Sequence, residues 1–111
     1  MATYILLLTL TPEGQTMALE NPDYLLQIER DISVPGVQTL GVYAVLGECD
    51  FVTIVEADGN ETLARFSLEL GVRAGVHVTT MPVVPAASLA EAEDRPSRSS
   101  AIEELPGPLQ N

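Results

Sequence analysis

The sequence predicts an α+β fold of the ferredoxin-like class, with the element order βαββαβ and a four-stranded antiparallel sheet. Two runs, 3–10 and 51–55, are apolar on both alternating faces, which is typical of strands covered on both sides in the middle of a sheet. Two further runs, 37–46 and 76–81, alternate in polarity, as outer strands do. Helical spacing lies between the strands of each half, so we expect two βαβ units joined by a hairpin.

The first helical stretch carries two start signals. Thr11 before Pro12 places a capping side chain ahead of a proline at the first helical position, and Asn21 before Pro22 repeats the signal. We therefore expect two short helices or one kinked helix here. On the second piece, Leu25, Ile28 and Ile32 form an apolar face opposite the polar residues Gln27, Glu29 and Arg30.

A short turn separates the second and third strands. Residues 47–50 have the composition of a hairpin connection, in which we expect Asp50 to cap its own turn. In the strand before this turn, simple alternation puts Thr39, Gly41 and Tyr43 on one face.

The second helical stretch follows the strand that ends near residue 57. Asp58 and Glu61 resemble a capping box, and Gly71 is placed for a left-handed residue at the end of the helix. The apolar positions at helical spacing are Leu63, Phe66 and Leu70.

Two helices cover only one face of a four-stranded sheet. The other face is also apolar along the two central strands, and apolar surface of this kind is relieved by pairing with a second copy. We therefore expect a homodimer that forms through the sheet faces. Residues 1–85 are predicted to form this one domain.

Composition narrows the choice of partners. The 111 residues include 16 acidic side chains and five arginines, for a formal net charge of −11, which repels phosphate backbones and anionic membranes. No apolar run approaches the roughly 20 residues of a membrane-spanning helix, and the amino terminus has no basic segment. These features predict a cytoplasmic protein that binds neither nucleic acid nor membranes. The single cysteine, Cys49, allows no disulfide framework within one chain.

Several short motifs together resemble the GYD-domain family, which is named for a Gly-x-Tyr-Asp turn. In this sequence Cys49 stands where the family has tyrosine, so a role for that phenol is not carried over. The resemblance covers about residues 2–84 and implies a dimeric α/β barrel of mostly unassigned function. The matching positions are residues 1–5, Leu8, Thr11, Gly14, Gly47, Asp50, residues 55–57, Leu68, Leu70 and Gly71.

His77 is the one candidate for a catalytic group. It shares a face of its strand with Thr79 and Met81, and a histidine can act as a general base near neutral pH. The plainer interpretation is a structural histidine, because no second histidine completes a metal site and no motif supplies a carboxylate partner. No metal site is predicted.

Ligand binding has four candidate residues. Tyr4, Tyr24 and Tyr43 could offer hydroxyls to a ligand, although amphipathic rings more often pack with one end in water. Arg65 could pair with a substrate carboxylate, and a surface ion pair is the competing interpretation. Cys49 lies between two acidic residues, which disfavour a reactive thiolate.

The composition changes after residue 85. A helical turn or two is expected in 86–94, and the rest of the segment 86–111 is predicted to be a disordered tail, since it is rich in serine and proline. Its apolar residues either dock on a larger partner or are incidental, and they are Ile102, Leu105 and Leu109.

Two function classes remain open. The first is a homodimeric module that binds a small apolar molecule or serves in assembly, because no catalytic constellation is visible. The second is a cofactor-independent enzyme of the monooxygenase or isomerase type, which would use the cleft between helices and sheet. No cofactor is predicted: the single histidine matches no haem pattern, and the segment 71–75 has two glycines but no lysine for a nucleotide phosphate.

Overall fold

The computed structural model describes residues 1–93. The element order contains the predicted βαββαβ pattern. The first helical position is filled by two short helices, and a short additional helix follows the last strand. The strands are β1 (Ala2–Leu10), β2 (Val37–Ala44), β3 (Phe51–Ala57) and β4 (Val76–Val83), and the helices are α1 (Pro12–Glu20), α2 (Tyr24–Asp31), α3 (Asn60–Ala74) and α4 (Ala87–Glu93).

The four strands form one antiparallel sheet in the order β2-β3-β1-β4. The two runs that are apolar on both faces, β1 and β3, are therefore the central strands, and the α+β ferredoxin-like class is confirmed. The two strands that are richest in apolar residues thus have a neighbouring strand on each edge, whereas β2 and β4 are the edge strands.

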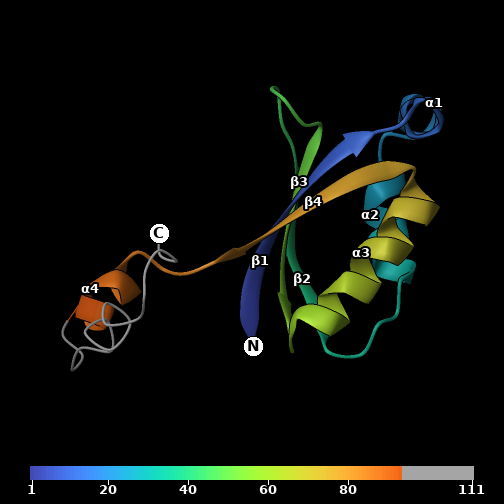
Figure 1. Cartoon of the computed structure of the whole chain (residues 1–111). Helices are drawn as coiled ribbons and strands as arrows, with labels where there is room; N and C mark the ends of the chain where they lie inside the picture. The colour runs from blue at the N-terminus through green and yellow to red at the C-terminus, as the bar shows by residue number, and fades with distance from the viewer. Residues whose placement is uncertain (94–111) are drawn as a thin grey trace, which may run out of the picture.

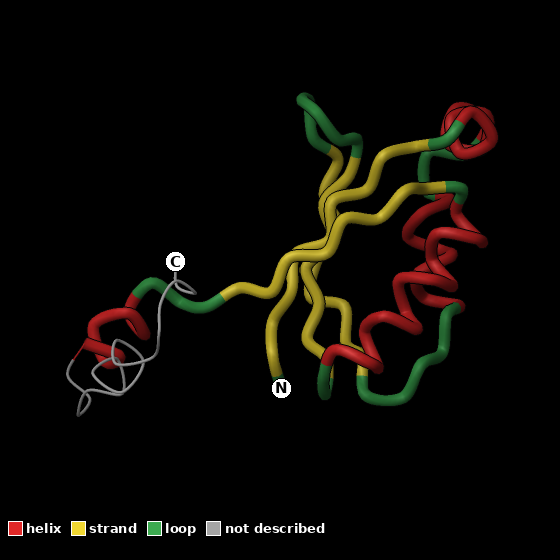
Figure 2. Tube along the Cα trace, in the orientation of Figure 1, coloured by secondary structure: helices red, strands yellow, loops and turns green. Residues whose placement is uncertain are grey.

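Within residues 1–93, helices cover one face of the sheet and leave the other without a helix layer. Helices α1, α2 and α3 lie on the same side of the strands, as Figures 1 and 2 show. The alternation of β1 follows this arrangement: Tyr4, Leu6 and Leu8 are buried under the helices, whereas Ile5 and Leu7 between them are only half-buried. The core on the helix side also includes Tyr24, Leu25, Ile32, Val34, Val55, Ala57, Leu63, Phe66, Leu70, Ala74 and Val76.

The first helical stretch is in two pieces, as predicted. The Thr11 hydroxyl accepts a hydrogen bond from the Gly14 amide at 3.1 Å and so caps α1. The same hydroxyl donates to the Gly75 carbonyl at 3.0 Å, which ties α1 to the end of α3. A Cβ atom on Gly14 would collide with that carbonyl, so only glycine permits this close approach.

Helix α3 differs from the prediction at both ends. Gly59 is its N-cap and no side chain caps it, so the capping box expected from Asp58 and Glu61 was wrong. Gly71 lies inside the helix, and Gly75, with φ 68°, is the left-handed residue that ends it.

Strand β2 contains an irregularity that alternation alone does not reveal. Its register on β3 shifts between Thr39 and Gly41, where Leu40 is an extra residue in a β-bulge. As a result, Thr39 faces the helices while Gly41 and Tyr43 face the other side, and the prediction that these three share a face was wrong. The strand also ends at Ala44, two residues before the predicted end.

The helical turns expected at the start of the tail are α4. The remaining tail positions, 94–111, lie outside the described residues, and they include the possible docking residues Ile102, Leu105 and Leu109.

Candidate functional site

A cavity of about 690 Å³ lies between α3 and β4. This volume falls within the roughly 300–1,000 Å³ of small-molecule pockets. Its outer rim is apolar and open to solvent, because Leu68 and Val72 on α3 are 72% and 85% exposed. We call this cavity the α3–β4 groove; it is lined by Tyr4, Asn60, Leu63, Ala64, Ser67, Leu68, Gly71, Val72, Val76, His77, Val78, Thr80 and Pro82.

Few polar groups border the α3–β4 groove. The Tyr4 hydroxyl donates a hydrogen bond of 2.6 Å to the Asn60 side-chain oxygen, and both residues line the groove. The hydroxyls of Ser67 and Thr80 lie 3.4 Å apart between α3 and β4. A mostly apolar wall with isolated hydroxyl and amide groups favours a neutral, apolar occupant.

His77 and Tyr4 both border the groove, but their functional groups do not converge. On β4, Val76 is buried and Val78 is half-buried under the helices, so strand alternation points the intervening His77 side chain to the opposite face. The Tyr4 side chain lies on the helix side, where it bonds Asn60. No general base of the described residues is therefore paired with a hydroxyl in the groove.

Tyr24 lies in the core on the helix side rather than in the groove. Its hydroxyl donates to the Ala74 carbonyl at 3.0 Å and thereby satisfies the end of α3. Burial, with a smaller contribution from the Asp50 carboxylate, raises the pKa of the Tyr24 phenol. These contacts give Tyr24 a packing role.

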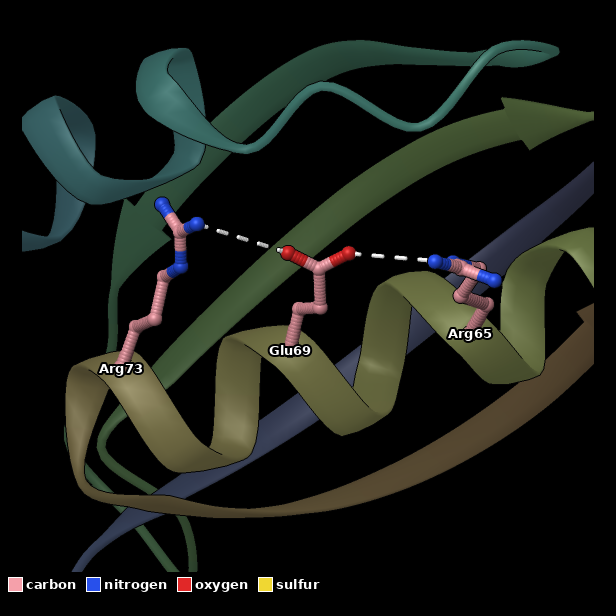
Figure 3. Close-up of polar contacts among 3 residues, drawn as sticks. All are labelled: Arg65, Glu69 and Arg73. Atoms are coloured by element: carbon pink, nitrogen blue, oxygen red, sulfur yellow. Dashed lines mark ion pairs between the residues drawn. The ribbon is translucent and has the colours of Figure 1, made fainter.

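Tyr43 and Arg65 lie on the surface, away from the groove. Tyr43 is 56% exposed on β2, and its ring lies against Gly41 on the same strand. Figure 3 shows Glu69 between Arg65 and Arg73, at nitrogen–oxygen distances of 3.9 and 3.6 Å. These long contacts between partly exposed side chains are the surface ion pair that competed with carboxylate binding, and they add little stability.

The helical pattern did not identify Glu29 as a buried residue. The sequence places it on the polar face of α2, yet it is only 6% exposed and lies against the sheet. Its carboxylate accepts hydrogen bonds from Thr53 at 2.7 Å and from Thr39 at 3.5 Å. Burial raises the pKa of Glu29, and the two hydroxyls partly oppose this shift.

A signal for Glu29 was present in the sequence. Thr53 is the polar residue in the middle of the central strand β3, on the face that the helices cover. A buried hydroxyl requires a hydrogen-bond partner, and the covering helix is the element that can supply one.

The turn before β3 is held by Asp50, although not as predicted. The Asp50 carboxylate accepts a hydrogen bond of 2.9 Å from the Leu10 amide at the end of β1. The prediction that Asp50 caps its own turn was therefore wrong, because the side chain fixes the turn to a neighbouring strand. Cys49 beside it is free and half-buried.

The sheet face opposite the helices is a second candidate surface. In the register of the strands, Ile5 pairs with Ile54 on one side and with Met81 on the other, while Leu7 pairs with Val52. We call this surface the open face; its large apolar and aromatic side chains include Ile5, Leu7, Tyr43, Val52, Ile54 and Met81. Such side chains spread over four strands are suited to contact with another protein surface.

Across residues 1–93, no helix is long and apolar enough to cross a membrane. Within the same residues, no three His, Cys, Asp or Glu side chains are grouped so that they could hold a metal ion.

Comparison with known proteins identifies the relatives of this chain. The model of the GYD domain family matches residues 4–92. A Thermus thermophilus protein named glutamine synthetase and cystathionine beta-lyase binding protein is 38% identical over 90 residues, which are 80% of this chain and 95% of that protein.

Solved structures share the fold at low sequence identity. The structure of MtbAldR (Rv2779c) superposes with a TM-score of 0.59 at 20% identity, over 76% of this chain and 53% of that one. A mutant of Rv3291c gives a TM-score of 0.58 at 15% identity, over 78% of this chain and 52% of that one. The chain thus matches about half the length of these structures, and the likeness concerns the fold.

Proposed function

Because the chain belongs to the GYD domain family, we propose that it is a homodimeric binding module that docks onto enzymes of the glutamine synthetase or cystathionine beta-lyase type. The observation that carries this proposal is the relative named as a binding protein for those two enzymes, which aligns over nearly its whole length. The proposal includes a cytoplasmic location, which suits a chain whose single cysteine forms no disulfide framework.

The homodimer forms through the open face. Ile5, Leu7 and Ile54 are neutral and half-buried, so bringing two copies together there removes apolar surface from water. Alternation along β3 places one acidic side chain, Glu56, on this face, near the end of the strand. Such an interface is self-complementary under a two-fold axis.

The enzyme partner binds on the helix side, at the α3–β4 groove. Leu68 and Val72 expose large apolar side chains at its rim, and surface of this kind marks sites of protein contact. Because the open face is occupied by the second copy, the groove remains free in the dimer to receive an apolar segment of the enzyme.

Size-exclusion chromatography with light scattering tests the proposal on the full-length chain. We expect a dimer that elutes together with glutamine synthetase or cystathionine beta-lyase from the same organism. A Leu68→Glu/Val72→Glu variant should remain dimeric and lose the enzyme, whereas Leu19→Glu, at a leucine that is 84% exposed on α1, should behave as the unaltered chain. Absence of binding to both enzymes at about 100 µM would refute the proposal.

A small apolar molecule is the second candidate occupant of the groove. The volume of about 690 Å³ and the pair formed by Tyr4 and Asn60 favour a neutral ligand that carries one polar group. Native mass spectrometry of protein purified from its own host would detect such a ligand as added mass, and a Gly71→Leu variant, which fills the groove, should lose it. The cofactor-independent enzyme is not retained, because His77 and Tyr4 point to opposite faces of the sheet.

A further inference from the structure

Helix α4 stands apart from the rest of the described chain. It follows β4 after a linker of Val84, Pro85 and Ala86, and makes no extensive contact with any other element of residues 1–93. In Figure 1, α2 and α3 lie to the right of the sheet and α4 lies to its left; Figure 2 shows the same separation. Its one large apolar side chain, Leu89, is 63% exposed. We call the segment 84–93 the arm.

A helix of this length is not stable without tertiary contacts. Isolated helices shorter than about 12–15 residues are marginal in water, and α4 has seven residues. At the start of α4, the Ser88 amide donates a hydrogen bond to the Pro85 carbonyl, and the Leu89 amide donates one to the Ala86 carbonyl. The helix therefore requires a surface to pack on, and its own chain, as far as it is described, does not provide one.

The position of the arm identifies that surface. The three linker residues span at most about 10 Å, and packed sheets lie about 10 Å apart. The arm extends on the side of the open face, and its linker is long enough to bring α4 level with a second sheet laid on that face. The apolar row of the open face also runs along β4 from Met81 to Val83, the last residue of the strand, so the arm begins where the open face ends.

We propose that α4 packs against the sheet of a second copy of this chain, so that each protomer holds its partner with its arm. The proposal rests on the homodimer proposed above. Two-fold symmetry makes the exchange reciprocal, which places two copies of Leu89 in the interface. The family match supports including the arm in the functional unit, because it extends through residue 92 and thus takes in α4.

A dilution series tests the arm in the full-length chain. Leu89→Glu should weaken the dimer about tenfold for each arm, and so about a hundredfold in all, because each glutamate replaces an apolar contact. Leu19→Glu adds the same charge to an exposed leucine on α1 and should change the dissociation constant by less than about threefold. An equal loss of dimer affinity in the two variants would overturn the proposal, because added negative charge alone would then explain the effect of Leu89→Glu.

Hydrogen exchange separates this inference from the homodimer itself. The amides of α4 should be protected at concentrations where the chain is dimeric and should exchange at the rate of an unstructured peptide after dilution to monomers. A dimer whose α4 amides exchange freely, and which tolerates Leu89→Glu, would overturn the arm exchange and leave the homodimer standing. A chain that is monomeric at every concentration would overturn both.

Discussion

The two faces of the sheet bury apolar surface in different ways. On the helix side the core is complete within one chain, and no buried side-chain nitrogen or oxygen of the described residues lacks a hydrogen-bond partner. On the open face, equally apolar side chains of the same strands stop at half burial. A single copy can therefore fold by burying the helix-covered face, and its open face is available for association. Substitutions on the two faces should therefore have different consequences.

The largest contrast is expected between two neighbouring leucines of β1. Leu6 is fully buried under the helices, so Leu6→Ala should lower the free energy of unfolding by about 2–5 kcal/mol at any protein concentration. Leu7 points to the open face, so Leu7→Ala should lower the free energy of unfolding by less than about 1 kcal/mol in dilute solution and should weaken the proposed dimer.

Urea unfolding at low concentration, combined with sedimentation at a series of concentrations, measures both effects. If Leu7→Ala destabilised the dilute monomer as strongly as Leu6→Ala, the distinction between the two faces would fail.

A smaller contrast is expected between two glycines. Gly14→Ala forces a Cβ against the Gly75 carbonyl where α1 meets the end of α3, and overpacking of this kind costs about 1–3 kcal/mol. Gly47→Ala is the matched control, because no atom beyond its two chain neighbours lies within 4 Å of the position that a Cβ would take. Thermal unfolding should show a clear loss for the first variant and little change for the second. Equal melting temperatures would mean that the helix layer tolerates movement at this contact.

The sequence predicts the strands of the sheet and their order. It does not predict which polar side chains bond between the helices and the sheet or between distant strands. Strand order follows from local apolarity, because β1 and β3 need cover on both faces. The bulge at Leu40 and the left-handed Gly75 depend on how β2 and α3 meet their neighbours. Local patterns gave no sign of the bulge and assigned the left-handed residue to Gly71. Asp50 was assigned to its own turn because the strand end that it bonds, at Leu10, is 40 residues away.

The candidate site was predicted only in part for the same reason. Tyr4 and His77 both border the α3–β4 groove. Alternation along β4 indicates the face of His77, but no periodicity indicates that Tyr4 bonds Asn60. The burial of Glu29 follows from the orientation of α2 on the sheet, which its helical pattern alone does not determine.

The smallest expected effect concerns Glu29 and depends on pH. Burial raises its pKa in the folded state above the ordinary value of 4.5, so the folded state binds more protons than the unfolded state above that pH. The resulting contribution to stability is fully present below pH 4.5 and is lost as pH rises through the raised pKa. Glu29→Gln removes this titration and keeps the bonds, since an amide can accept from Thr53 and donate to Thr39.

Urea unfolding between about pH 4 and pH 8 should therefore show Glu29→Gln gaining stability relative to the unaltered chain as pH rises through the raised pKa. Glu20→Gln, at an exposed position on α1, is the matched control and should show no such trend. A difference in stability between the Glu29→Gln variant and the unaltered chain that stays constant over this pH range would mean that the carboxylate is solvated in the folded state. The helix-covered face would then admit water beside Thr53, and the two faces would differ less in their exclusion of water than the burial of their side chains indicates.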